Sequence, residues 1–194
     1  MPRTKTSDAG ATRDASDAPV SKPRRITRRK AVEEHALAYF DALGRRDLEA
    51  MSERWREDGV VDLAPIGVFR GRDEIAHLFR ELFAALPDFE VRITRLVPGE
   101  REAAVEWRAS GHFTGSPFQG IEATGRPVEL RGLDLMEIED GKNVSITAYY
   151  DGMEFARQIG LMPTQDSGAE RALKNTFNAA TRLRQAVGAR RGLR

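Results

Sequence analysis

The spacing of apolar residues changes from a helical to an alternating pattern near residue 89, and this change constrains the fold more than any other feature. Before it, apolar residues recur every three or four positions, which is typical of amphipathic helices. After it, they alternate with polar residues, which is typical of half-buried strands. Helices followed by strands joined through short turns predict an α+β fold, in which an antiparallel sheet packs on helices.

The first part of the chain predicts three helices and one short strand. An apolar stripe over residues 32–43 predicts the first helix. Asp47 is a candidate N-cap of a second, shorter helix. Residues 60–64 indicate a strand, and the proline and glycines of residues 65–71 indicate a loop. A third helix has its apolar face over residues 75–86.

Four strands are predicted after the change in spacing. They lie near residues 89–97, 103–113, 127–138 and 143–150. A short helix is predicted over residues 154–163, where a glycine and a proline end the domain.

The formal net charge of +1 conceals three regions of different charge. Residues 1–30 hold nine Lys/Arg, three Asp and few large apolar residues, so we expect a disordered basic tail. Residues 31–163 hold 15 basic and 25 acidic residues and form the predicted domain. Residues 164–194 hold seven basic and two acidic residues and show helical apolar spacing. One interpretation is that the N-terminal tail aids solubility and the C-terminal tail docks on the domain or on a sister subunit. The other is that the tails contact nucleic acid or an acidic partner.

Composition excludes several classes of site. The chain has no cysteine, which excludes disulfides, Cys-ligated metals and a Cys nucleophile. It has no apolar run long enough for a membrane span and no secretory signal, so we expect a cytoplasmic protein. The three histidines share no ligand spacing, and no phosphate-binding or dinucleotide motif is present, so we expect no metal and no cofactor.

Three polar residues stand out on faces predicted to be buried. In the strand 127–138, Asp134 shares its face with apolar neighbours, where desolvation favours the neutral carboxyl. It is either a perturbed group of a functional site or a carboxyl satisfied by the backbone or an arginine. Tyr39 and His35 lie one turn apart on the buried face of the first helix, where each needs a polar partner.

Several motifs between Trp107 and Gly160 resemble those of the SnoaL-like polyketide (ester) cyclases, in the nuclear-transport-factor-two-like superfamily. The motifs are Gly111-x-x-Thr114-Gly115, Pro117-Phe118-x-Gly120, Ala123-Thr124-Gly125-Arg126, Arg131-Gly132-x-Asp134, Asp140-Gly141-Lys142, and Asp151 followed by Arg157-Gln158-Ile159-Gly160. The resemblance covers about residues 31–163. It implies a cone-shaped, curved antiparallel sheet packed on three N-terminal helices, with a ligand pocket inside.

The resemblance also implies site residues. Asp151 matches the general acid/base at the end of the last strand of the cyclases, and Phe113 takes the place of a pocket histidine. Tyr39 and Asp134 resemble the tyrosine and the neutral aspartic acid of the ketosteroid isomerase oxyanion hole, and Asp62 lies next to the position of that family's base. The remaining expected pocket residues are His35, Trp107, Met136 and Tyr150.

We therefore expect an enzyme that performs cofactor-free proton transfer and enolate stabilisation on an apolar substrate carrying a carbonyl group. Closure of a polyketide ester ring and ketone isomerisation both fit, and the resembled fold implies a homodimer. The alternative is a non-catalytic domain that binds a ligand or dimerises, whose basic tails contact nucleic acid or an acidic partner.

Overall fold

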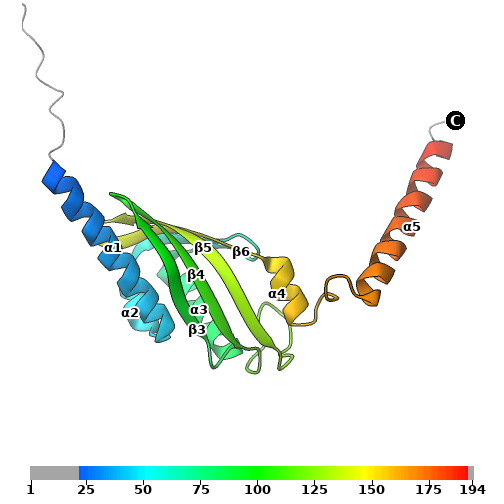
Figure 1. The fold of residues 1–194 in the computed structure, drawn as a ribbon, viewed down its shortest axis with the longest axis horizontal. Helices are drawn as coiled ribbons and strands as arrows, with labels where there is room; N and C mark the ends of the chain where they lie inside the picture. Colours follow the sequence, from blue (N-terminus) through cyan, green and yellow to red (C-terminus); the bar gives the residue numbers. More distant parts are fainter. Residues whose placement is uncertain (1–21, 192–194) are drawn as a thin grey trace, which may run out of the picture.

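Six strands form one strongly curved sheet, which is the frame of the molecule (Figure 1). The structure is a computed structural model and describes residues 22–191. Along the sheet the strands lie in the order β2-β1-β6-β5-β4-β3. Their bounds are β1 (Trp55–Leu63), β2 (Gly67–Arg70), β3 (Glu90–Pro98), β4 (Glu102–His112), β5 (Pro127–Glu139) and β6 (Lys142–Tyr150). The four strands predicted after residue 89 are confirmed as β3 to β6.

The strand pairing differs from the prediction at one place. Strands that follow one another, β1–β2, β3–β4, β4–β5 and β5–β6, are antiparallel as expected. The exception is the pairing of β1 with β6, which is parallel and was not anticipated. The apolar spacing within a strand identifies its buried face, but it does not identify a partner that is distant in sequence.

The loop predicted at residues 65–71 contains a strand. The backbone N–H of Ile66 donates to the carbonyl of Leu63 at 2.7 Å, which turns the chain back on itself. β2 then pairs with β1, with Val60 opposite Arg70. Only four residues are paired in this hairpin, so its apolar alternation is too short to be recognised from the sequence.

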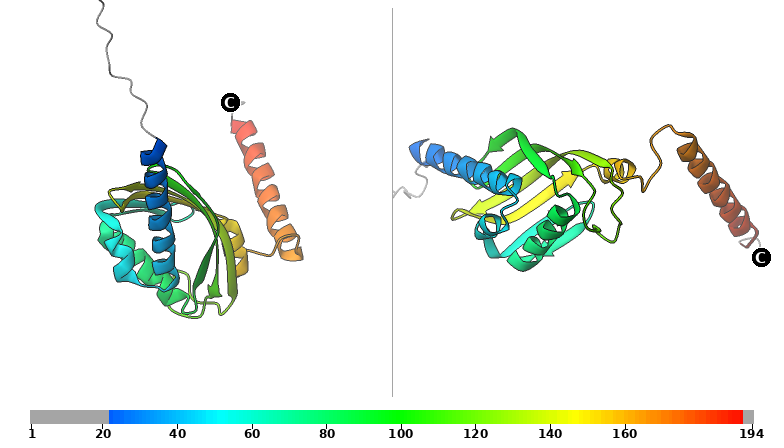
Figure 2. Two further views of the ribbon diagram at one scale, coloured as in Figure 1. Left: turned by 60° about the vertical axis from the view of Figure 1, so that its left-hand side comes forward. Right: turned by 90° about the horizontal axis from the view of Figure 1, so that it is seen from below.

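Three helices cover the concave side of the sheet (Figure 2). They are α1 (Lys22–Gly44), α2 (Leu48–Glu53) and α3 (Gly71–Ala85). α1 packs against β3 and β4, and α3 packs against β1. The carboxylate of Asp47 accepts a hydrogen bond from the N–H of Ala50 at 3.0 Å, which confirms it as the N-cap of α2. The α+β prediction, with a curved sheet on three N-terminal helices, is confirmed.

The first helix begins earlier than predicted. Residues 22–30, expected to belong to the disordered tail, form the first turns of α1. Arg and Lys are good helix formers, and adding turns to an existing helix requires no new nucleation, so this segment needs no apolar face of its own. The rest of the predicted tail, residues 1–21, lies outside the described residues.

The C-terminal segment is helical, as predicted, and lies away from the sheet. A short helix, α4 (Gly152–Gln158), follows β6, and α5 (Gly168–Arg191) extends from it (Figures 1 and 2). Arg157 of α4 pairs with the buried Glu170 at 3.3 Å, which ties the start of α5 to α4. Leu173, Phe177 and Leu183 of α5 are exposed. No helix among residues 22–191 is both long and apolar enough to cross a membrane.

Candidate functional site

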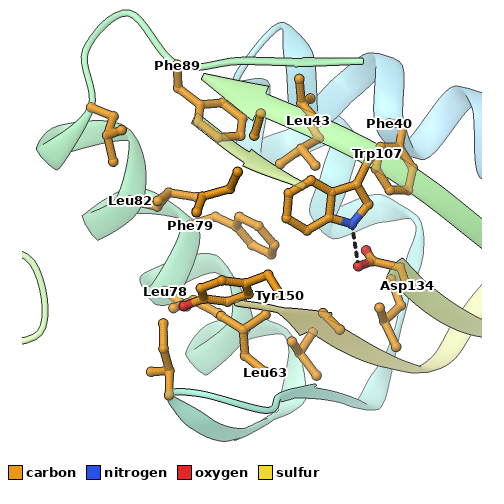
Figure 3. A pocket seen from close by; sticks show the side chains of 18 of the residues that line it. Phe40, Leu43, Leu63, Leu78, Phe79, Leu82, Phe89, Trp107, Asp134 and Tyr150 are labelled. Carbon is orange, nitrogen blue, oxygen red and sulfur yellow. Dashed lines mark hydrogen bonds between the residues drawn. The ribbon is translucent and has the colours of Figure 1, made fainter. Parts of the chain in front are cut away.

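A cavity of about 120 Å³ lies between the concave side of the sheet and the helices α1 and α3 (Figure 3). Its wall is apolar except for a few side chains. Among the residues that line it, those with a polar side-chain group are Tyr39, Trp107, Ser110, Asp134 and Tyr150. The cavity is therefore a place where an apolar molecule meets a small number of fixed polar groups.

Asp134 of β5 is the carboxyl in this lining and is only 8% exposed. Its Oδ1 accepts a hydrogen bond from the indole Nε1–H of Trp107 at 2.7 Å (Figure 3). Burial raises the pKa of Asp134 to about 7, and the hydrogen bond from Trp107 opposes this rise. The predicted burial of Asp134 is confirmed, and its side-chain partner is an indole rather than an arginine.

The position of the Trp107 indole depends on the glycine opposite it. Trp107 of β4 pairs with Gly132 of β5, two residues before Asp134. A Cβ at position 132 would lie 2.7 Å from Cε2 of the indole and 2.7 Å from the carbonyl oxygen of Tyr149. Since glycine has no Cβ, the indole lies across β5 and its N–H reaches the carboxyl of Asp134.

Tyr39 of α1 is buried and lines the cavity. Burial raises the pKa of its hydroxyl, and the negative charge of Asp134 raises this pKa further. The hydroxyl therefore stays neutral and keeps its proton to donate. His35, one turn earlier, is buried but does not line the cavity, because its Nε2 lies 2.8 Å from Oδ1 of the buried Asn143.

Asp62 and Asp151, the two expected bases, are not brought to the cavity. Val61 and Leu63 line it, so the alternation of β1 turns Asp62 toward the other face of the sheet. Asp151 is exposed and caps α4, where its Oδ1 accepts from the N–H groups of Met153 and Glu154, both at 3.0 Å. The expectation that either carboxyl lies in the pocket is therefore not met.

The other expected pocket residues divide into lining and core. Trp107 and Tyr150 line the cavity, and burial raises the pKa of Tyr150 to about 12. Phe113 and Met136 are buried on the same side of the sheet but do not line the cavity. His112 is exposed outside the lining, and its Nδ1 lies 2.6 Å from a carboxylate oxygen of Asp88.

Several lining residues were not named as site residues from the sequence. Phe40, Phe79 and Leu82 belong to apolar helix stripes that the spacing identifies, but a stripe does not reveal which members face a cavity. Phe118 comes from the long connection between β4 and β5. The Pro117-Phe118-x-Gly120 motif was the available signal for it.

The described residues contain no group of three or more His, Cys, Asp or Glu side chains placed to hold a metal ion. No curated protein matches the chain. Solved structures share its fold at identities below 25%. AclR from Streptomyces galilaeus is 18% identical, with 81% of this chain and 97% of AclR covered and a TM-score of 0.63. IdmH from Streptomyces antibioticus is 24% identical, with 66% and 97% covered and a TM-score of 0.57.

A third similar structure is a protein with a ketosteroid isomerase-like fold from Catenulispora acidiphila, in complex with trimethylamine. It is 21% identical, with 66% of this chain and 92% of that chain covered and a TM-score of 0.56. The family model described as SnoaL-like polyketide cyclase matches residues 33–159, which span the curved sheet, the helices that cover it and the cavity between them. The chain therefore belongs to the SnoaL-like polyketide cyclase family.

Proposed function

We propose that this protein is an enzyme that moves a proton on an apolar, carbonyl-containing substrate without a cofactor. The observation that carries the proposal is the carboxyl of Asp134 inside an apolar cavity, with a pKa of about 7. A group with a pKa near neutrality acts as base in one step and as acid in the next. Family membership supports a small-molecule substrate.

In the proposed reaction, the carboxylate of Asp134 takes a proton from the carbon next to the substrate carbonyl. The electrons of the broken C–H bond pass into an enolate, whose oxygen receives a hydrogen bond from the neutral hydroxyl of Tyr39. Protonated Asp134 then returns the proton. Return to a conjugated carbon moves a double bond, whereas return to the alkoxide formed when the enolate attacks a second carbonyl completes a ring closure.

This assignment changes the role of Asp134. The family resemblance implies that Tyr39 and Asp134 are joint hydrogen-bond donors and that Asp62 or Asp151 transfers the proton. Since neither of those carboxyls lines the cavity, we assign proton transfer to Asp134 and oxyanion stabilisation to Tyr39. The hydrogen bond from Trp107 engages Oδ1, so Oδ2 is the atom that exchanges the proton.

The cavity volume bears on the size of the substrate. A cavity of about 150 Å³ accommodates benzene in an engineered protein, and the cavity in this structure has about 120 Å³. The cavity is therefore close to the size that holds one ring, and a substrate of several rings requires the lining side chains to move.

The proposal can be tested without knowing the natural substrate. Cyclohexanone carries one ring and one carbonyl, and the exchange of its α-hydrogens in D2O, followed by NMR, reports proton abstraction directly. Asp134→Asn should lower the protein-catalysed rate by about 10²- to 10⁴-fold, and Tyr39→Phe by about 10²-fold.

Asp62→Asn is the matched control, because it makes the same change on a strand residue outside the cavity, and it should leave the rate unchanged. Wild-type exchange no faster than in buffer, or a rate insensitive to Asp134→Asn, would show that the carboxyl of Asp134 does not abstract the proton.

A further inference from the structure

The free oxygen of Asp134 has no positively charged partner in the cavity. Oδ1 accepts from Trp107, and the salt bridges found within residues 22–191 do not include Asp134. The cavity lining contains no Lys, Arg or His. An ionised carboxylate that is buried without a cation is strongly destabilised. A ligand that carries its own positive charge would remove this penalty.

The walls near Asp134 suit a cation with an apolar surface. The indole of Trp107 donates to the carboxyl, and the rings of Phe40 and Tyr39 line the same cavity. The faces of aromatic rings attract positive charge, most strongly where water is excluded. The remainder of the wall is aliphatic or aromatic, so it also accommodates alkyl groups.

The number of N–H donors distinguishes the kinds of amine. A primary ammonium carries three N–H donors, so besides the one free carboxylate oxygen it needs two hydroxyls of the lining to converge on it. The Tyr150 hydroxyl points away from Asp134 in Figure 3. A protonated tertiary amine carries a single N–H, which one carboxylate oxygen satisfies, and its three alkyl groups contact the apolar wall.

We propose that the cavity also binds small tertiary alkylamines as cations, with the ammonium N–H donating to Oδ2 of Asp134 and the alkyl groups packed against the aromatic wall. The volume of about 120 Å³ limits the ligand to about one six-membered ring. The inference does not rest on the proposed reaction, because it needs only the ionised carboxyl and the shape of the cavity.

Binding of the amine requires the ionised carboxyl of Asp134, whereas binding of a neutral ketone does not depend on this charge. The other titratable groups of the cavity lining are Tyr39 from α1 and Tyr150 from β6, and the lining residues of α3 are apolar. Burial raises the pKa of both tyrosines, so they stay neutral below about pH 9. Asp134 therefore controls the pH dependence of binding near neutrality, through its pKa of about 7.

The test is binding of N-methylpiperidine to the full chain, measured by isothermal titration calorimetry or by ligand-observed NMR at two pH values. The fraction of ionised Asp134 rises about 30-fold between about pH 5.5 and about pH 8.5, and the amine stays protonated over this range, so its affinity should rise by about the same factor. Cyclohexanone, a neutral ring of the same size, should bind no more tightly at the higher pH.

Asp134→Asn should weaken amine binding by about tenfold or more at about pH 8.5 and remove its pH dependence. Asp62→Asn, a substitution outside the cavity, should leave the affinity for the amine and its pH dependence unchanged. Equal affinity at the two pH values, no binding at the higher one, or full affinity in Asp134→Asn would overturn the inference. If Asp134→Asn does not fold, the wild-type pH profile alone decides. Loss of cyclohexanone exchange with amine binding intact contradicts only the proposed function.

Discussion

Substitution of Trp107 by phenylalanine should raise the pKa of Asp134. The indole N–H donates to Oδ1 at 2.7 Å, and this hydrogen bond favours the ionised carboxyl. Hydrogen bonds to charged groups contribute about 1.5–3 kcal/mol, and one pKa unit corresponds to about 1.4 kcal/mol, so the pKa should rise by about one to two units. The variant would then keep Asp134 protonated at neutral pH, which should slow proton abstraction and weaken amine binding.

The pKa of Asp134 can be measured from its side-chain 13C carboxyl shift during a pH titration, with the resonance assigned by its loss in Asp134→Asn. Trp55→Phe is the matched control, because Trp55 is the other tryptophan of the chain and does not line the cavity. Trp55→Phe should leave the pKa of Asp134 unchanged.

Phenylalanine is smaller than tryptophan, and water entering the enlarged cavity would lower the pKa of Asp134, which is the opposite direction. Site-specific replacement of Trp107 by benzothienylalanine keeps the bicyclic shape without the N–H, so it separates the two effects. An unchanged or lowered pKa in the benzothienylalanine variant would refute the role assigned to the hydrogen bond.

Three further outcomes are expected. Gly132→Ala should lower the free energy of unfolding by about 1–3 kcal/mol in urea, because its Cβ collides with the indole of Trp107; a variant as stable as the wild type would contradict this packing. Asp151→Ala should lower that free energy by about 0.5–2 kcal/mol through loss of the α4 cap while the exchange rate of the folded protein stays unchanged; a specific loss of rate would return Asp151 to the site. The folded-state pKa of Asp134, about 7, exceeds its ordinary value of 3.8, so the folded state holds the proton more tightly. This stabilisation is nearly complete below about pH 4 and is lost as the pH rises through about 7, so the wild type should lose about 3 kcal/mol relative to Asp134→Asn between these values in urea titrations, and a constant difference would contradict it.

The inner face of the sheet could be predicted from the sequence because alternation in a strand is a local property. In β5, Val128, Asp134 and Met136 are buried, whereas Leu133 and Leu135 on the other face are exposed. Placing Asp134 among apolar neighbours therefore needed no knowledge of which strands pair. The same alternation puts Trp107 on the inner face of β4, where it lines the cavity.

The hydrogen bond between Trp107 and Asp134 could not be predicted, because it depends on the register of β4 against β5. Trp107 lies opposite Gly132, so the indole reaches diagonally to the carboxyl. A register shifted by two residues would leave both faces as they are and place another residue opposite Trp107. The Arg131-Gly132-x-Asp134 motif includes the glycine and the carboxyl, but it does not show that Trp107 lies opposite Gly132.

The prediction that Asp62 or Asp151 lies in the pocket was not met for a related reason. A carboxylate that follows a strand and precedes a helix suits both an N-cap and a catalytic base, and residue type does not separate the two roles. The local N–H groups of α4 engage Asp151. Asp62 was expected in the pocket because it lies next to the position that matches the isomerase base. A displacement of one residue in a strand moves the side chain to the opposite face of the sheet.

If both proposals hold, one oxygen atom links them. Because Trp107 engages Oδ1, a proton abstracted from a ketone and the N–H of a tertiary amine compete for Oδ2 of Asp134. N-methylpiperidine should therefore inhibit cyclohexanone exchange competitively, and its inhibition constant should fall as the pH rises toward about 8.5, since the amine needs the ionised carboxyl. Non-competitive inhibition would place the amine elsewhere, whereas competition that is independent of pH would mean that the two ligands share the space of the cavity but not the charge of Asp134.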